Sequence, residues 1–288
     1  MERVGPTIAL VAALMLSPAD APAQAPTAAA KAGEEYEISR RYETSSRTTD
    51  GSSGSSSGQD VIVERVIAVR GDGLELEYDL PKTATAERRA REWKFPLRIF
   101  KPWNGTTQLL NRPELEARID RWLKAAKWDR SACGRWIFTW NAFRIECDPQ
   151  AAIGTVEGFD LRIADVREGA PYKVPGARAP ATLARKASGP DGTSFTVSLE
   201  VDPEAVRRAR AESDVMAGEI MRTPVTLEAS LRERAKESIT GTITVTLDAD
   251  AGGNVWRRTT VTRLTTRRPD GVVESATATE TVERPPVS

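Results

Sequence analysis

Strict alternation of residue types near the C-terminus constrains the fold of this chain more than any other feature. From Ile239 to Leu247, every odd position carries an aliphatic residue or glycine, and every even position from Thr240 to Thr246 carries threonine. Successive side chains of a β-strand point to opposite faces of its sheet, whereas a helix would spread both residue types around its axis. The pattern therefore predicts a strand with one face toward a core and a hydroxyl-rich face toward water.

Neighbouring segments extend this pattern into two antiparallel meanders, one at each end of the chain. Gly71-Asp72-Gly73 and Pro269-Asp270-Gly271 supply the residues of tight turns between alternating segments. The predicted strands are residues 34–48, 61–69 and 74–80 near the N-terminus and residues 239–247, 255–266 and 272–283 near the C-terminus.

A run of glycine and serine separates the first two predicted strands. Residues 51–58 contain only these two residue types. Such a segment has little side-chain area to bury and much conformational entropy to lose on ordering. We therefore expect a mobile hairpin loop over residues 50–59.

The first central helix is predicted after Asn111. Asn111, Pro113 and Glu114 are typical of a helix start, since Asn caps, Pro fits the first turn and Glu favours the positive end of the helix dipole. The apolar residues that follow have helical spacing and would form one buried stripe: Leu115, Ile119, Trp122, Leu123 and Ala126.

Two further helices are predicted closer to the C-terminus. Asp202-Pro203-Glu204 begins one in the same way, and Thr223-Pro224 begins a shorter one. In the longer helix we expect an outward basic face of Arg207, Arg208 and Arg210, and an inward face of Val206, Ala209, Ser213, Met216 and Ile220.

These elements predict an α+β fold in which antiparallel meanders from both ends of the chain form one curved sheet packed against central helices. The terminal segments Tyr36–Leu80 and Ile239–Glu283, arranged around central helices, resemble bacterial periplasmic proteins with a curved antiparallel sheet, of which the lipoprotein-carrier half-barrels are an example. The resemblance implies an apolar cavity for acyl chains. It covers the terminal strands and carries over no functional residue.

The N-terminus has the pattern of a secretory signal peptide. Arg3 precedes the apolar run Ile8–Leu16, which is too short to span a bilayer and leads into small residues and prolines. We predict a signal peptide over residues 1–23, a flexible leader over 24–33 and a single α+β domain over 34–284. A composition with 28% charged and 40% hydrophobic residues is compatible with one large globular domain. The protein is therefore expected to be periplasmic or secreted.

Export affects how the two cysteines are interpreted. In an oxidising compartment, Cys133 and Cys147 are expected to form a disulfide across a strand-like hairpin, with two buried thiols as the alternative. Their spacing is too wide for a redox motif. The bridge is thus predicted to support stability and not chemistry.

The chain contains no histidine, which excludes Ser-His-Asp and Cys-His nucleophile activation and every metal site that needs an imidazole ligand. The segment Asp248–Asn254 begins like a calcium loop, but Thr259 stands where the bidentate glutamate belongs, so a hairpin loop is predicted. Carboxylates remain the only general acid or base, and they cluster after the second cysteine: Asp148, Glu157, Asp160 and Asp165.

A basic, aromatic segment is the main candidate for a binding surface. Six of the seven tryptophans lie within residues 93–140 of a chain whose 41 basic and 41 acidic residues otherwise balance. Either the tryptophans belong to the core and the cations to a solvated face, or the segment binds an anionic or carbohydrate ligand. The candidate contacts are Arg88, Arg89, Arg91, Trp93, Lys94, Lys101 and Trp103.

The function predicted from the sequence is non-catalytic binding, or a structural role in the cell envelope. The partner would be an anionic envelope lipid or glycan, with no nucleic acid, no membrane-spanning segment and no cofactor. An acyl-chain carrier and a carboxylate-dependent glycan hydrolase are the alternatives. A continuous apolar cavity at the sheet would favour the carrier, and a cleft with two carboxylates about 5 to 10 Å apart would favour the hydrolase.

Overall fold

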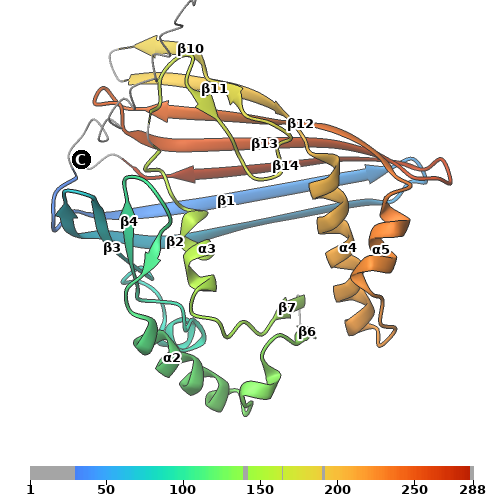
Figure 1. Cartoon of the computed structure of the whole chain (residues 1–288), viewed down its shortest axis with the longest axis horizontal. Coiled ribbons are helices and arrows are strands. Elements are labelled where there is room, and N and C mark those ends of the chain that lie inside the picture. The colour runs from blue at the N-terminus through green and yellow to red at the C-terminus, as the bar shows by residue number, and fades with distance from the viewer. Residues whose placement is uncertain (1–29, 139–141, 164, 190–191, 286–288) are drawn as a thin grey trace, which may run out of the picture.

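A large antiparallel sheet dominates the computed structural model, which describes residues 30–138, 142–163, 165–189 and 192–285. The sheet has ten strands (Figure 1). In spatial order they are β10 (Ala184–Gly189), β11 (Gly192–Glu200), β12 (Ser238–Ala249), β13 (Val255–Arg267), β14 (Val273–Glu283), β1 (Glu35–Thr48), β2 (Ser53–Arg70), β3 (Gly73–Asp79), β4 (Leu97–Pro102) and β5 (Gln108–Leu109).

The two predicted meanders join through β1 and β14, the strands nearest the two ends of the chain. Ser39 lies opposite Glu283 and Thr48 opposite Glu274, in an unbroken antiparallel register. The predicted α+β fold with one curved sheet is confirmed. The predicted signal peptide, residues 1–23, and most of the leader over 24–33 lie outside the described residues.

Alternation divides the sheet into a covered face and an open face. Val245 and Leu247, both 0% exposed, point to the covered face, where they meet the core. Their neighbours Thr244 and Thr246 point to the open face. None of the open-face residues of β12, β13, β14 and β1 is buried. The hydroxyl-rich face predicted from the alternation is thus a real feature of the fold.

The prediction of a mobile loop over residues 50–59 was wrong. β2 begins at Ser53, and Gly54, Ser55 and Ser56 pair in register with Ser46, Ser45 and Thr44 of β1. The turn is confined to Thr49–Ser52 and is closed by the Asp50 carboxylate, which accepts a hydrogen bond from the Ser52 amide. Backbone pairing along a long neighbouring strand overrides the low strand propensity of glycine and serine.

Five α-helices lie within the described residues, α1 (Ala86–Arg91), α2 (Arg112–Ala125), α3 (Ala151–Glu157), α4 (Pro203–Ile220) and α5 (Leu227–Arg234), together with a short 3-10 helix over Arg130–Ala132. A short hairpin of β6 (Trp136–Phe138) and β7 (Ala142–Arg144) follows α2, and β8 (Pro171–Tyr172) pairs with β9 (Ala181–Thr182). Figure 1 shows α2 and α3 in one group and α4 and α5 in a second group near the opposite strand ends, with the β6–β7 hairpin between them. None of these helices is long and apolar enough to cross a membrane.

The helix predicted after Asn111 is confirmed as α2, and Leu115, Ile119 and Leu123 are buried as expected. Asn111 does not cap it. The Asn111 side chain instead accepts a hydrogen bond from the Arg98 amide and donates one to the Pro96 carbonyl. Asn111 therefore fastens the start of α2 to the loop and strand before it.

The helix predicted after Asp202 is confirmed as α4, with the Asp202 carboxylate capping the Glu204 amide. Its predicted inward face was wrong in part, because Ala209 and Ser213 are exposed whereas Ala211 and Gly218 are buried. Arg207 and Arg210 also do not face solvent. The Arg207 guanidinium donates to the Glu237 carbonyl, and Arg210 pairs with acidic side chains of the sheet end.

Candidate functional site

The cations of the predicted binding segment are spread over several separate contacts. Arg89 pairs with Asp79 and donates to the carbonyls of Leu80 and Pro81, and Arg91 pairs with Glu87 within α1. Lys101, on β4, forms an ion pair with Asp160. Arg88 is exposed on α1.

The two aromatic candidates have structural contacts of their own. Trp93 is 5% exposed and belongs to the core, with the Lys94 ammonium 5.9 Å from its ring centre. Trp103 donates from its indole nitrogen to the Gly71 carbonyl across the end of β3. The structure therefore does not gather the seven residues around one hollow, and ligand binding by them stays a prediction.

The four carboxylates considered for acid–base chemistry do not share a partner, because those that form ion pairs do so with different cations. Asp148 is 3.6 Å from Arg112, Asp165 is 2.6 Å from Arg167, and Asp160 pairs with Lys101. Glu157 is exposed at the end of α3. Three of the four carboxylates thus have a cation of their own.

Cys133 and Cys147 form the predicted disulfide, with their Cα atoms 5.6 Å apart. It closes the loop that carries the β6–β7 hairpin, and both cysteines pack against the core beside α2 and α3. Closing a loop of about 15 residues stabilises a fold by roughly 3 kcal/mol in the chain-entropy model. A stabilising role of this bridge stays a prediction.

A hollow of about 310 Å³ lies on four central strands of the sheet, β2, β1, β14 and β13, toward the turns that join β1 to β2 and β13 to β14. We call its floor the small-residue strip. Its covered-face members are Thr44 and Ser46 of β1, Gly54 and Ser56 of β2, Ala276 and Ala278 of β14, and Thr262 and Leu264 of β13. The register places them in two adjacent rows, so short side chains from four neighbouring strands leave the hollow above them.

The glycines of β2 explain part of this shape. A β-carbon at Gly58 would overlap the ring of Tyr42, which therefore lies flat against the strand and borders the strip. Glycine inside a strand is unfavourable unless a ligand or another group approaches the backbone closely. Tyr42, Thr44 and Ala278 are all exposed, although they share a face with the core.

Charged residues border both ends of the strip along the strands. Toward α3, Arg258 donates to the Gly158 and Asp160 carbonyls and lies 3.8 Å from Glu280. Toward α4, Arg210 lies 3.0 Å from Glu274. Glu280 and Glu274 are six residues apart on β14, which corresponds to about 20 Å. The uncharged strip fills the interval between them.

A buried ion pair fixes the α3 side of the covered face. Glu64, 1% exposed, accepts two hydrogen bonds from Arg162 and one from the Tyr78 hydroxyl. Burial and the neighbouring Glu64 carboxylate raise the pKa of Tyr78 well above its ordinary value. The Tyr78 hydroxyl therefore keeps its proton at neutral pH and donates it to the Glu64 carboxylate.

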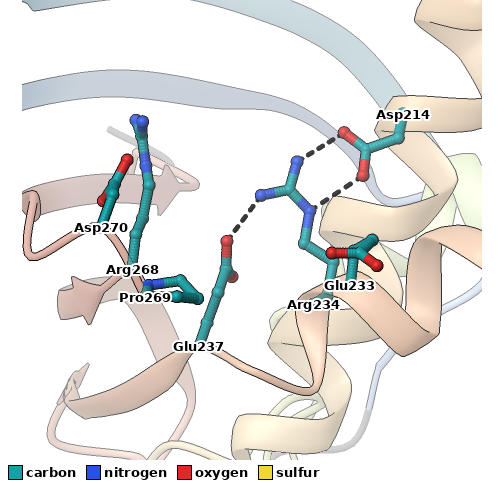
Figure 2. Close-up of a pocket in the computed structure, with 7 residues that line it drawn as sticks. All are labelled: Asp214, Glu233, Arg234, Glu237, Arg268, Pro269 and Asp270. Carbon is teal, nitrogen blue, oxygen red and sulfur yellow. Dashed lines mark hydrogen bonds and ion pairs between the residues drawn. The ribbon is translucent and has the colours of Figure 1, made fainter.

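A second hollow, of about 340 Å³, lies beside α4 and α5 and is lined mostly by charged residues (Figure 2). Arg234 reaches between Asp214 and Glu237, with an Nε–Oδ2 distance of 2.8 Å to Asp214 and an Nη1–Oε1 distance of 2.6 Å to Glu237. The Arg234 hydrogen bonds hold the pKa of Asp214 below its ordinary value. Three of the charged residues in this hollow thus pair with one another, whereas Glu233 pairs with Lys236 outside it.

Sequence reasoning missed the small-residue strip because the Gly/Ser run was assigned to a loop. A signal was present: Gly54, Ser56 and Gly58 have the same parity as the buried Ile62 and Val66 of the same strand. The alternation of β2 therefore continues through the run, with apolar residues replaced by small ones.

Comparison with known proteins assigns no family: no family model and no curated protein matches the chain. A solved structure of lipovitellin, described for its lipid–protein interactions, has a TM-score of 0.36 and 11% identity over 90% of this chain. The chain spans only 26% of that protein's length. A hot dog fold protein from Alicyclobacillus acidocaldarius gives a TM-score of 0.12 at 11% identity, covering 90% of this chain and 81% of that one. Both TM-scores are too low to assign a shared fold.

Proposed function

We propose that this protein is an exported, non-catalytic binding protein of the cell envelope that holds a single apolar chain, such as a fatty acyl chain, along the small-residue strip. The strip itself is the observation that carries the proposal. It is a hollow on the covered face of the sheet whose floor consists of short side chains, with the only large aliphatic one from Leu264.

The shape and the chemistry of the strip both favour an extended apolar ligand. Its volume is at the low end of the range for small-molecule sites, which suits one chain better than a bulky ring system. Methyl groups of Ala276, Ala278 and Thr262 supply apolar contacts without filling the space. Charged residues at both ends of the strip leave an uncharged interval between them.

Export rests on separate support. The apolar run Ile8–Leu16, with its small-residue boundary, has the pattern of a signal peptide, and the Cys133–Cys147 disulfide suits an oxidising compartment. Fractionation of cells with mass spectrometry of the N-terminus tests it. Recovery of the chain in the cytosol with Met1 intact would contradict it.

The binding proposal is tested by filling the strip. Ala278 is exposed, so Ala278→Phe should fill the hollow without disturbing the core. Displacement of a fluorescent long-chain fatty acid measures the affinity. We expect it to fall by at least about tenfold, or about 1.4 kcal/mol.

Thr279→Phe is the matched control, because Thr279 is the next residue on β14 and points to the open face. It should leave the affinity unchanged. Equal losses in both variants, or no binding of the fatty acid by the wild type, would refute the proposal.

A further inference from the structure

The open face carries arginines that differ in their pairing from one end of the sheet to the other. Near β14's C-terminal end, Arg41 lies 3.1 Å from Glu283 and Arg257 lies 2.7 Å from Asp248. Such cross-strand ion pairs are the usual arrangement for charges on a sheet face. They neutralise that end of the face.

Toward the hairpin tips, the arginines of the same face have no acidic neighbour across the strands. Arg263 lies between Thr242 and Thr277, and Arg47 lies between Ser275 and Ser53. Arg267 lies between Ser238 and Val273. All three arginines are exposed, and none forms an ion pair with any described residue.

The nearby carboxylates of the described residues form no ion pair with these three arginines. Asp50 and Asp270 lie in the two hairpin turns. Asp50 accepts a hydrogen bond from the Ser52 amide, and Asp270 accepts one from the Val272 amide. Glu200 pairs with Arg178. Glu43 lies in the neighbouring row of the open face, opposite Thr279, and is four residues from Arg47 along β1, about 13 Å away.

We propose that this part of the open face, which we call the arginine–hydroxyl face, binds an acidic polysaccharide. Guanidinium groups pair well with sulfate, phosphate or carboxylate groups. Arg263 and Arg267 are separated by about 13 Å along β13, and Arg47 lies two strands from β13, about 10 Å across the sheet. Separated anionic groups on an extended chain suit this spacing better than one small anion does.

The hydroxyls between the arginines supply the second part of the recognition. Thr265, Ser275, Thr277 and Ser45 lie in the same rows and point to the same face. Serine and threonine hydroxyls both donate and accept hydrogen bonds, as sugar hydroxyls do. Val261 and Val273 are the apolar residues here and are half-buried, so the face offers little to insert into a bilayer. A polysaccharide therefore fits it better than a membrane surface.

Fluorescently labelled dextran sulfate is a suitable probe, and neutral dextran of the same size is the uncharged control. Because the chain has no net charge, attraction of a polyanion to the whole molecule is weak. We expect the wild type to bind dextran sulfate, to bind neutral dextran at least about tenfold more weakly, and to lose affinity as salt rises.

A triple variant tests the location. Arg47→Ser, Arg263→Ser and Arg267→Ser together should lower the affinity at least about tenfold and reduce the slope of log affinity against log salt by about 3. The matched control removes the same charge elsewhere, through Lys173→Ser, Arg208→Ser and Arg222→Ser, three exposed positions away from this face. It should change the affinity by less than about twofold. Thermal unfolding and fatty-acid displacement should be unchanged in both triple variants.

Three results would overturn the proposal. One is an equal loss in the two triple variants, which would mean attraction by net charge alone. Another is tighter binding to phosphatidylglycerol vesicles than to dextran sulfate, which would indicate a membrane. The third is no binding of dextran sulfate by the wild type at low salt.

Discussion

The two helix groups on the covered face are attached to the sheet by different forces. α2 and α3 bury an apolar surface, in which Leu115 and Ile119 of α2 are 0% exposed and Val156 of α3 is 1% exposed. α4 and α5 bury only small residues, Ala211, Gly218 and Ser230. Ion pairs, and not a large apolar contact, attach this second group to the sheet.

The ion pairs at α4 and α5 form one chain of contacts. Asp214 pairs with Arg234, Arg234 with Glu237, Glu237 with Arg210, and Arg210 with Glu274 of the sheet. Glu237 is buried, with a side chain 4% exposed, and removal of either arginine would leave this buried side chain without one of its two ion-pair partners. Apolar packing is insensitive to pH, whereas this attachment depends on the charge of its carboxylates. One border of the small-residue strip is therefore more easily loosened than the other.

The largest effect is expected from Ile119→Ala in α2. Removing a fully buried aliphatic side chain should lower the free energy of unfolding by about 3 kcal/mol. Leu231→Ala in α5 is the control, because Leu231 is only half-buried and should cost about 1 kcal/mol. Urea unfolding measures both. Equal costs would contradict the contrast between the two helix groups.

A smaller, local effect is expected from Arg234→Met. This change removes charged hydrogen bonds to Asp214 and Glu237 and should destabilise α5 by about 2 kcal/mol. Hydrogen exchange should show faster exchange of the α5 amides while the α2 amides stay protected. The exposed pair of Arg232 with Glu228 provides the control, since Arg232→Met should cost less than about 0.5 kcal/mol. Uniform loss of protection across both groups would argue against separate attachment.

The smallest effect is expected from acidification. The pKa of Asp214 is lowered in the folded protein by its hydrogen bonds from Arg234. A carboxyl with a lowered pKa stabilises the fold above its unfolded pKa of about 4, and this contribution is lost as pH falls through the folded value. The α5 amides should therefore lose protection at a higher pH than the α2 amides.

Asp214→Asn isolates this contribution. The variant cannot titrate at this position, so the dependence of α5 protection on pH should become flatter below about pH 4. An unchanged pH profile would assign the acid sensitivity to another carboxylate.

Much of the fold could be predicted from the sequence because strand alternation and helix-start residues are local signals. The threonine alternation of residues 240–246 predicted both faces of β12, and Asp202-Pro203 predicted the start of α4. The direction of the α4 arginines could not be predicted in this way. Arg207 and Arg210 turn toward the sheet because Glu237 and Glu274, distant in sequence, supply the compensating contacts there.

The sequence by itself determined the alternation of the terminal strands and the starts of α2 and α4, whereas the helix predicted from Thr223-Pro224 begins at Leu227 in the structure. The tertiary structure decided what the Gly/Ser run became. Residues 53–58 have little strand propensity of their own, but the register with β1 supplies their backbone hydrogen bonds and makes them part of the floor of a hollow. The structure also decided which arginines form no ion pair with a described residue, since Arg47, Arg263 and Arg267 lie opposite only serine, threonine and valine on the neighbouring strands. Both outcomes depend on register between distant strands, a property that no local pattern encodes.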